Sequence, residues 1–159
     1  DRTILTPVEI SMLRRQILYV ALALLFLGGI GSDIFDFSAA WARGSGAIFA
    51  GFVGLLSGSV LTPMLLPWLP GRAFSLKGVW IGSGAALLLC LSLFSDSGLL
   101  NQIALLLQVT AISSYTAMNF TGSSTYTSPS GVEKVMRLAI PCHLTAVGIA
   151  LTLWLWAAF

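Results

Sequence analysis

The chain has 159 residues, of which 57% are hydrophobic and only 9% charged, and its mean hydropathy is +0.92. Soluble domains carry about 25% charged residues, so this chain has too little charge to cover a surface in water. Its apolar runs are continuous rather than alternating, which excludes a transmembrane barrel built from strands of about ten residues. The composition therefore predicts an all-α, polytopic membrane protein.

The net charge, the two cysteines and the first residue say less about the class of the protein than its composition does. The net charge of +2 says little until its distribution is considered. Cys90 and Cys142 lie in apolar surroundings, without metal-ligand spacing and without a disulfide framework. Because the chain begins with Asp1 rather than Met, we expect it to be part of a longer or processed protein.

The N-terminal stretch carries a helix start. Thr6 can cap a helix, Pro7 suits the first helical position, and Glu9 completes a capping-box spacing. We expect residues 1–15 to form a cytoplasmic or interfacial lead-in helix, either lying on the membrane or running directly into the first span. Residues 16–159 should then form one domain of five transmembrane helices. The expected spans are about 16–31, 47–68, 78–94, 99–118 and 138–159.

The connections around the second span have distinct compositions. Aromatic residues in 31–44 indicate a loop along the membrane interface. Pro63, Pro67 and Pro70 are expected to end the second span, because proline removes a backbone donor and clashes with the preceding turn. The segment 71–77 that follows is expected to be a tight basic loop.

The later connections are shorter or more polar. Residues 95–98 leave so little chain that the third and fourth spans should be antiparallel neighbours. The last helix is expected to begin at about Val132 or Leu138. Pro141 either kinks that helix or separates a surface turn from the span proper.

Small residues at a spacing of four mark two spans for close packing. Gly54 and Gly58 lie on the second span, and Gly78 and Gly82 on the third. Such faces let two helix backbones approach each other. They also leave room for a homodimer.

The basic residues orient the spans. Seven of the eight fall on one side: Arg2, Arg14, Arg15, Arg72, Lys77, Lys134 and Arg137. The opposite loops hold Arg43 with three acidic residues, Asp33, Asp36 and Asp96. The positive-inside rule therefore predicts a cytoplasmic N-terminus and an external C-terminus.

The fourth span is the polar one. Asn101, Gln108, Tyr115 and Asn119 are spaced seven, seven and four residues apart, so they share one helical face. Uncharged polar groups commonly join helices in membranes. We therefore interpret this face as interhelical hydrogen bonding rather than as a transport path.

A polar run from Asn119 to Arg137 interrupts the apolar sequence. Its hydroxyl groups belong to Thr121, Ser123, Ser124, Thr125, Tyr126, Thr127, Ser128 and Ser130. Interspersed glycine and proline favour ordered turns, and Ser130 with Glu133 has the spacing of a capping box. The run is either a structured loop or a linker made soluble by its hydroxyls. By the orientation above it faces the cytoplasm.

Residues able to do chemistry are scarce. No expected span has a charged residue at its middle, which argues against a proton- or ion-coupled transporter. The chain has no P-loop, HExxH, GxSxG or carboxylate pair. Cys142 and His143 are candidates for a soft metal ion such as Hg(II) or Cu(I). However, adjacent helical residues point about 100° apart, so a packed thiol with an interfacial histidine is favoured, and Cys90 is interpreted as packing.

Three segments carry a resemblance to a known family. They read LTPVE at 5–9, LTPMLLPWLPGRAFSLKG at 61–78 and MNFTGSSTYTSPSGVEKVMRLAIP at 118–141. Together they resemble the membrane domain of the mercury-methylating corrinoid proteins, the HgcA family. The likeness covers the whole chain, and the loop motifs are more specific than the spans.

The resemblance implies a function for the longer protein. In that family an N-terminal cobalamin-binding domain, absent from this chain, passes a methyl group from its corrinoid cobalt to Hg(II). A cysteine of that domain ligates the cobalt, and its motif is not found here, so this chain is expected to carry no catalytic site and no cofactor. A ferredoxin-like partner with iron–sulfur clusters completes the system. The implied location is the cytoplasmic membrane of an anaerobic bacterium or archaeon, with no nucleic acid among the partners.

By the same resemblance, the family's loop motif falls on Asn119, Phe120, Thr121, Gly122, Ser124, Thr125, Tyr126, Thr127, Ser130, Gly131 and Val132. We expect this loop, with Arg72, Lys77, Lys134 and Arg137, to dock the corrinoid domain or the iron–sulfur partner. Two alternatives remain. One is a stand-alone membrane carrier or assembly protein, and the other is the membrane domain of a corrinoid protein of one-carbon metabolism.

Overall fold

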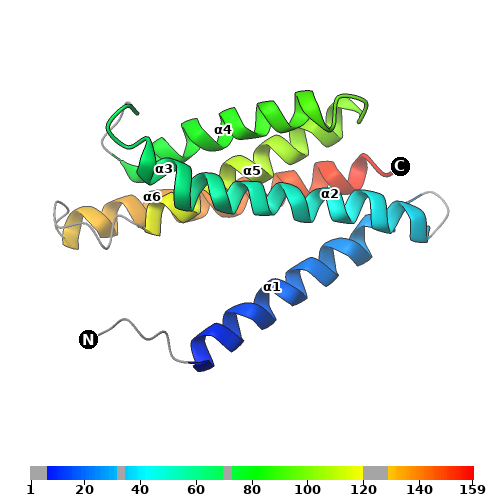
Figure 1. Ribbon diagram of the computed structural model, residues 1–159, viewed down its shortest axis with the longest axis horizontal. Coiled ribbons are helices and arrows are strands. Elements are labelled where there is room, and N and C mark those ends of the chain that lie inside the picture. Colours follow the sequence, from blue (N-terminus) through cyan, green and yellow to red (C-terminus); the bar gives the residue numbers. More distant parts are fainter. Residues whose placement is uncertain (1–6, 32–34, 70–72, 120–128) are drawn as a thin grey trace. The chain divides into compact units, whose positions relative to one another are not determined.

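The computed structural model describes the backbone of residues 7–31, 35–69, 73–119 and 129–159, and their side chains apart from 7–14, 129–132 and 134. All the regular secondary structure in these ranges is helical (Figure 1). The elements are α1 (Pro7–Gly28), α2 (Phe37–Leu56), η1 (Ser57–Leu61), α3 (Thr62–Met64), α4 (Phe74–Ser92), α5 (Leu99–Asn119) and α6 (Pro129–Trp156). They belong to two compact units, residues 1–48 with 158–159 and residues 49–157, which are described separately.

The all-α prediction is confirmed, and the length and composition of several helices are compatible with a membrane location. Within the described ranges, three helical stretches are long and apolar enough to cross a membrane, namely Phe37–Met64, Phe74–Ser92 and Val135–Trp156. The apolar part of α1, Arg15–Gly28, is shorter, and α5 has the length but is not among the three. Five crossings and the orientation of the termini therefore stay predictions.

The second helix begins ten residues earlier than expected. Phe37 is its first residue because Asp36 caps it: the Asp36 carboxylate accepts a hydrogen bond from the Ser38 N–H at 2.9 Å and another from the Ser38 hydroxyl. Both hydrogen bonds lower the pKa of Asp36 below its ordinary value, and the bond from the Ser38 backbone N–H has the larger effect. The prediction of a loop over 31–44 is thus wrong for residues 37–44, which are helical.

The same helix continues beyond α2 through a wider turn. In η1 the Thr62 N–H bonds the carbonyl of Ser57, five residues back, and the Thr62 hydroxyl donates to the same carbonyl at 2.9 Å. This π-type turn directly precedes Pro63, where a regular α-turn is disfavoured because proline lacks an N–H. The helix then ends at Met64, so proline termination is confirmed but falls four residues before 68.

Two further helix starts differ from the prediction. α4 begins at Phe74, so the expected loop over 71–77 is wrong for its last four residues, and the Lys77 N–H bonds the Ala73 carbonyl. α6 begins at Pro129, a residue suited to the first helical position. Ser130 therefore lies inside the helix instead of capping it, and Glu133 pairs with Arg137 at 2.8 Å.

α6 runs unbroken through Pro141, so the alternative of a surface turn before the span is wrong. The expected span at 99–118 agrees with α5 to within one residue. Its short connection to α4 is fastened by Gln102, whose amide donates to the carbonyls of Phe94 at 2.9 Å and Ser95 at 3.1 Å. The antiparallel neighbours predicted from this connection are confirmed (Figure 1).

In the first unit, α1 packs against the beginning of α2. α1 is continuous from Pro7 to Gly28, so the lead-in helix runs directly into the first apolar segment. A Cβ added at Gly28 would lie 2.9 Å from the Gly44 nitrogen, and one at Gly44 would lie 2.7 Å from the Leu25 Cα. Only glycine allows this approach.

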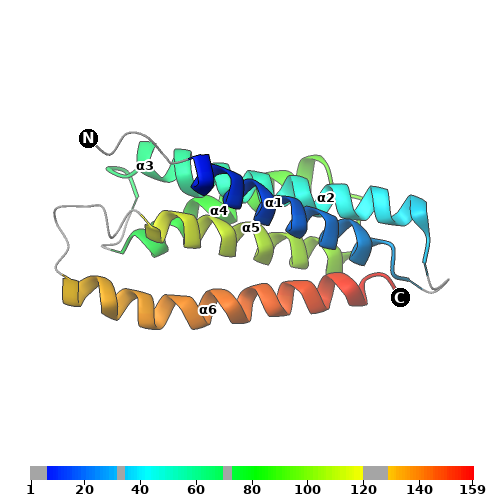
Figure 2. The ribbon, with the colours of Figure 1, turned by 90° about the horizontal axis from the view of Figure 1, so that it is seen from below.

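In the second unit, α5 lies between α4 and α6 (Figure 2). Three glycines meet α5 around Ser113. A Cβ at Gly82 would lie 2.6 Å from the Ser113 Cβ, and one at Gly58 would collide with Thr116 Oγ1 and the Ser113 carbonyl. At Gly78 it would lie 2.7 Å from both Ser114 Cα and Ala117 Cβ. The close packing predicted for the two glycine faces is confirmed, and both faces are occupied by α5 rather than free for a second copy.

The interior of this unit is built from small residues. Ala50, Ala86 and Cys90 form its core with Leu105 and Val109. Large apolar side chains point outward, such as Leu88 and Leu91, which are 71% and 75% exposed. Small residues at helix contacts with large apolar residues outside are typical of membrane bundles.

Adding one methyl group at two different glycines of α4 separates packing from helix propensity. We expect Gly78→Ala to destabilise the bundle by about 1–3 kcal/mol, because the methyl has no room against α5. Gly84 has open space around it, so Gly84→Ala should be neutral or stabilising by up to about 1 kcal/mol. Reversible unfolding in detergent micelles measures both, and equal stabilities would contradict the packing described here.

Candidate functional site

The candidate site is the end of the second unit at which α5 ends and α4 and α6 begin (Figure 2). Asn119 is the exposed last residue of α5. Ser130 and Gly131 lie in the first turn of α6. Lys77, in the first turn of α4, donates its Nζ to the Leu66 carbonyl at 2.8 Å, which ties the basic segment to the end of the preceding helix.

Much of the predicted docking loop lies outside the described residues. This applies to Arg72, Phe120, Thr121, Gly122, Ser124, Thr125, Tyr126 and Thr127. Their role stays a prediction. What the structure brings together is the three helix ends that flank them.

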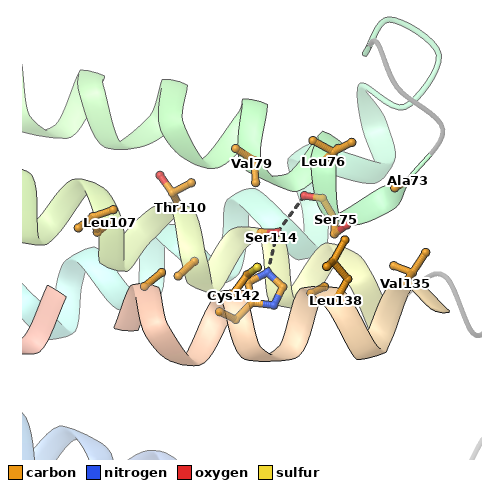
Figure 3. Close-up of a pocket in the computed structure, with 14 residues that line it drawn as sticks. Ala73, Ser75, Leu76, Val79, Leu107, Thr110, Ser114, Val135, Leu138 and Cys142 are labelled. Atoms are coloured by element: carbon orange, nitrogen blue, oxygen red, sulfur yellow. Dashed lines mark hydrogen bonds between the residues drawn. The ribbon is translucent and has the colours of Figure 1, made fainter. Parts of the chain in front are cut away.

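A chain of hydrogen bonds joins these helices just inside the candidate site (Figure 3). The Ser114 hydroxyl of α5 donates to the Ser75 carbonyl of α4 at 2.9 Å, and His143 Nε2 of α6 lies 2.8 Å from the same hydroxyl oxygen. A hydroxyl has one proton, and Ser114 gives it to Ser75. The imidazole must therefore donate through Nε2–H, which leaves Nδ1 as the unprotonated nitrogen of the neutral ring.

Ser113 makes a second such link. Its hydroxyl donates to the Gly78 carbonyl of α4 at 2.9 Å and is fully buried. Neither Ser113 nor Ser114 was singled out from the sequence, where they look like ordinary small residues. The glycine pair on α4 is the sequence feature that could have indicated them. Where glycines let two helices approach closely, the backbone carbonyls of one helix come within reach of short hydroxyl side chains on the other.

The predicted polar face of α5 is only partly assembled. A Cβ added at Gly51 of α2 would lie 3.7 Å from Gln108 Nε2. This proximity agrees with an interhelical role for Gln108. Tyr115 is half-exposed and meets the His143 ring edge-on, with centroids 6.0 Å apart. The Asn101 side-chain oxygen is buried without a hydrogen-bond partner.

A cavity of about 470 Å³ lies beside this hydrogen-bond chain (Figure 3). Its walls come from α4, α5 and α6, and most lining side chains are aliphatic, including Val79, Leu107 and Leu138. A smaller hollow of about 310 Å³ lies on the other side of His143. The larger hollow opens to the surface, since Leu76 and Leu138 in its wall are 53% and 74% exposed.

The cysteines occupy different surroundings. Cys90 is buried in the core, with its sulfur 3.6 Å from the Gln102 carbonyl, as the packing interpretation predicted. Cys142 is exposed and lines the larger cavity together with His143. His143 uses Nε2 to bond Ser114, and its Nδ1 is closed off from the surface. In the part of the chain that the structure describes, no three metal-ligating side chains gather, and metal binding by this pair stays a prediction.

Comparisons with models of protein families, with curated proteins and with solved structures found no match.

Removing the Ser114 hydroxyl tests the link between the three helices. We expect Ser114→Ala to destabilise the second unit by about 1–3 kcal/mol, because the His143 N–H loses its buried partner. His143→Phe should cost less in the Ser114→Ala background than in the wild-type protein, since the shared bond is already gone. Ser92→Ala is the matched control, because that hydroxyl only bonds carbonyls of its own helix. Additive effects of the two substitutions would contradict the link.

Proposed function

We propose that this chain is the membrane domain of a corrinoid-dependent methyltransferase that converts Hg(II) to methylmercury. In this proposal the chain anchors a cytoplasmic corrinoid domain and provides a docking surface for it or for the iron–sulfur partner. The corrinoid and the iron–sulfur clusters belong to those other components, and no step of the transfer takes place on this chain.

The observation that carries the proposal is the resemblance of the three loop-flanking segments at 5–9, 61–78 and 118–141. These segments are polar or proline-rich, so membrane composition alone does not account for their likeness. Two of them border the same end of the second unit: 61–78 runs into α4, and 118–141 spans the end of α5 and the start of α6. This gathering supports a single docking surface.

Charge supports the side of the membrane on which that surface would act. Lys77 and Arg137, both described, lie near the starts of α4 and α6 and carry positive charge toward this end. Positive charge next to spans favours the cytoplasmic side. A five-span bundle with a cytoplasmic N-terminus would then place the corrinoid domain, the loop and the partner in one compartment.

Reporter fusions test the sidedness. A reporter placed after Thr127 should report from the cytoplasm, and one placed after Ser97 from the outside, since the two connections flank α5 at opposite ends. Paired fusions of a periplasmic phosphatase and a cytoplasmic fluorescent protein give the readout. An external signal after Thr127 would separate the loop from the corrinoid domain and overturn the proposal.

Alanine substitution tests the docking role. Replacing Thr125, Tyr126 and Thr127 together in the full-length protein should lower methylmercury formation while membrane insertion is unchanged, because side chains that dock a partner are lost without altering the apolar spans.

The control is the triple replacement of Ser95, Asp96 and Ser97 in the connection at the other end of α5, which should retain activity. Methylmercury is measured with the iron–sulfur partner supplied. Unchanged formation by the first variant would remove the loop from the mechanism.

A further inference from the structure

The helical stretch Phe37–Met64 ends among closely spaced prolines, which remove backbone donors. In a regular helix each carbonyl accepts a hydrogen bond from the N–H four residues later. For the Leu66 carbonyl that position is Pro70, which has no N–H. The carbonyls of Pro63 and Leu65 accept backbone N–H groups at 3.4 and 3.0 Å. The Leu66 carbonyl therefore needs a donor of another kind.

Lys77 supplies that donor from the first turn of α4. Its Nζ lies 2.8 Å from the Leu66 carbonyl oxygen, and its side chain is half-buried. The Cα–Cβ bonds of a helix tilt toward its N-terminus, so a long side chain in the first turn reaches past the start of the helix. Because α3 and α4 contact each other, the end of the preceding helix lies within this reach (Figure 1).

The backbone that carries this side chain is anchored. The Lys77 N–H bonds the Ala73 carbonyl at 3.3 Å. The next residue, Gly78, packs against α5, and its carbonyl accepts the Ser113 hydroxyl. The ammonium thus extends from a fixed base toward the end of a 28-residue helical stretch. Positive charge is favoured there, because the last carbonyls of a helix carry partial negative charge.

Arg137 of α6 makes a different kind of contact. It pairs with Glu133 of its own helix at 2.8 Å, and the two side chains are 80% and 62% exposed. Such a pair contributes little to stability, because water and salt screen both charges. The Lys77 bond instead joins groups eleven residues apart, on either side of the connection between two helices.

We infer that Lys77 is a clasp, whose ammonium holds the proline-broken end of the preceding helix against the first turn of α4. In this role Lys77 is a positioning residue and not a contact for a partner. The clasp is a property of this chain alone. Its bearing on docking rests on the proposed function, because it fixes the start of α4, one of the helix ends that border the proposed docking surface.

Hydrogen–deuterium exchange of the full chain in lipid nanodiscs, with no partner present, tests the clasp. Lys77→Met keeps most of the side-chain length and removes the donor, so the backbone amides of residues 65, 66 and 68 should exchange several-fold faster. Lys77→Arg retains a cationic donor and should keep the exchange close to that of the unmodified protein. Unchanged exchange in Lys77→Met would overturn the clasp, whatever the docking experiments show.

Arg137→Met is the matched control, because it removes one positive charge from the same end and breaks only an exposed pair. It should leave exchange at residues 65–68 unchanged. Equal acceleration in Arg137→Met and Lys77→Met would assign the effect to net charge and overturn the clasp. Lys77→Gln replaces Lys77→Met should the latter fail to fold. Its side chain is too short to reach Leu66, so the same acceleration is expected.

Discussion

Close backbone approach around Ser113 of α5 is the constraint on which the second unit depends. Gly58 meets its backbone from the preceding helical segment, and Gly78 and Gly82 meet it from α4. Where helices come this close, carbonyl groups of one helix reach hydroxyls of the other, and the Ser113–Gly78 bond is the result. In a membrane such contacts matter because lipid is as apolar as the helix surface, so packing and hydrogen bonds hold the bundle together rather than water exclusion.

α6 is attached differently. Gly148, the glycine of α6 whose surroundings the structure describes, faces open space. The described contacts instead centre on His143, which bonds Ser114 and meets Tyr115 edge-on, with a hollow on either side. α6 also packs against α5, and its Ala150 and Trp154 are buried.

The proposed function and the fold rest on different kinds of support. The function rests on loop segments whose likeness to a mercury-methylating family is a matter of sequence. The fold supplies the scaffold that gathers the flanking helix ends at one end of the second unit. The docking surface itself stays a prediction, because most of its residues lie outside those that the structure describes.

The sequence by itself determined the class of the protein. Low charge and continuous apolar runs specify membrane helices wherever they occur, and glycines four residues apart specify close contacts, because both depend only on side-chain type and spacing. The first residues of the helices were harder to predict from the sequence. The cap at Asp36 depends on a backbone geometry that brings the Ser38 N–H to its carboxylate. α6 begins at Pro129 rather than after a cap at Ser130. Only the tertiary structure decided which hydroxyls join helices. Ser113 and Ser114 serve this purpose, rather than the larger amides alone, because the partner carbonyls come from α4, more than thirty residues away in the sequence, and no local pattern records them.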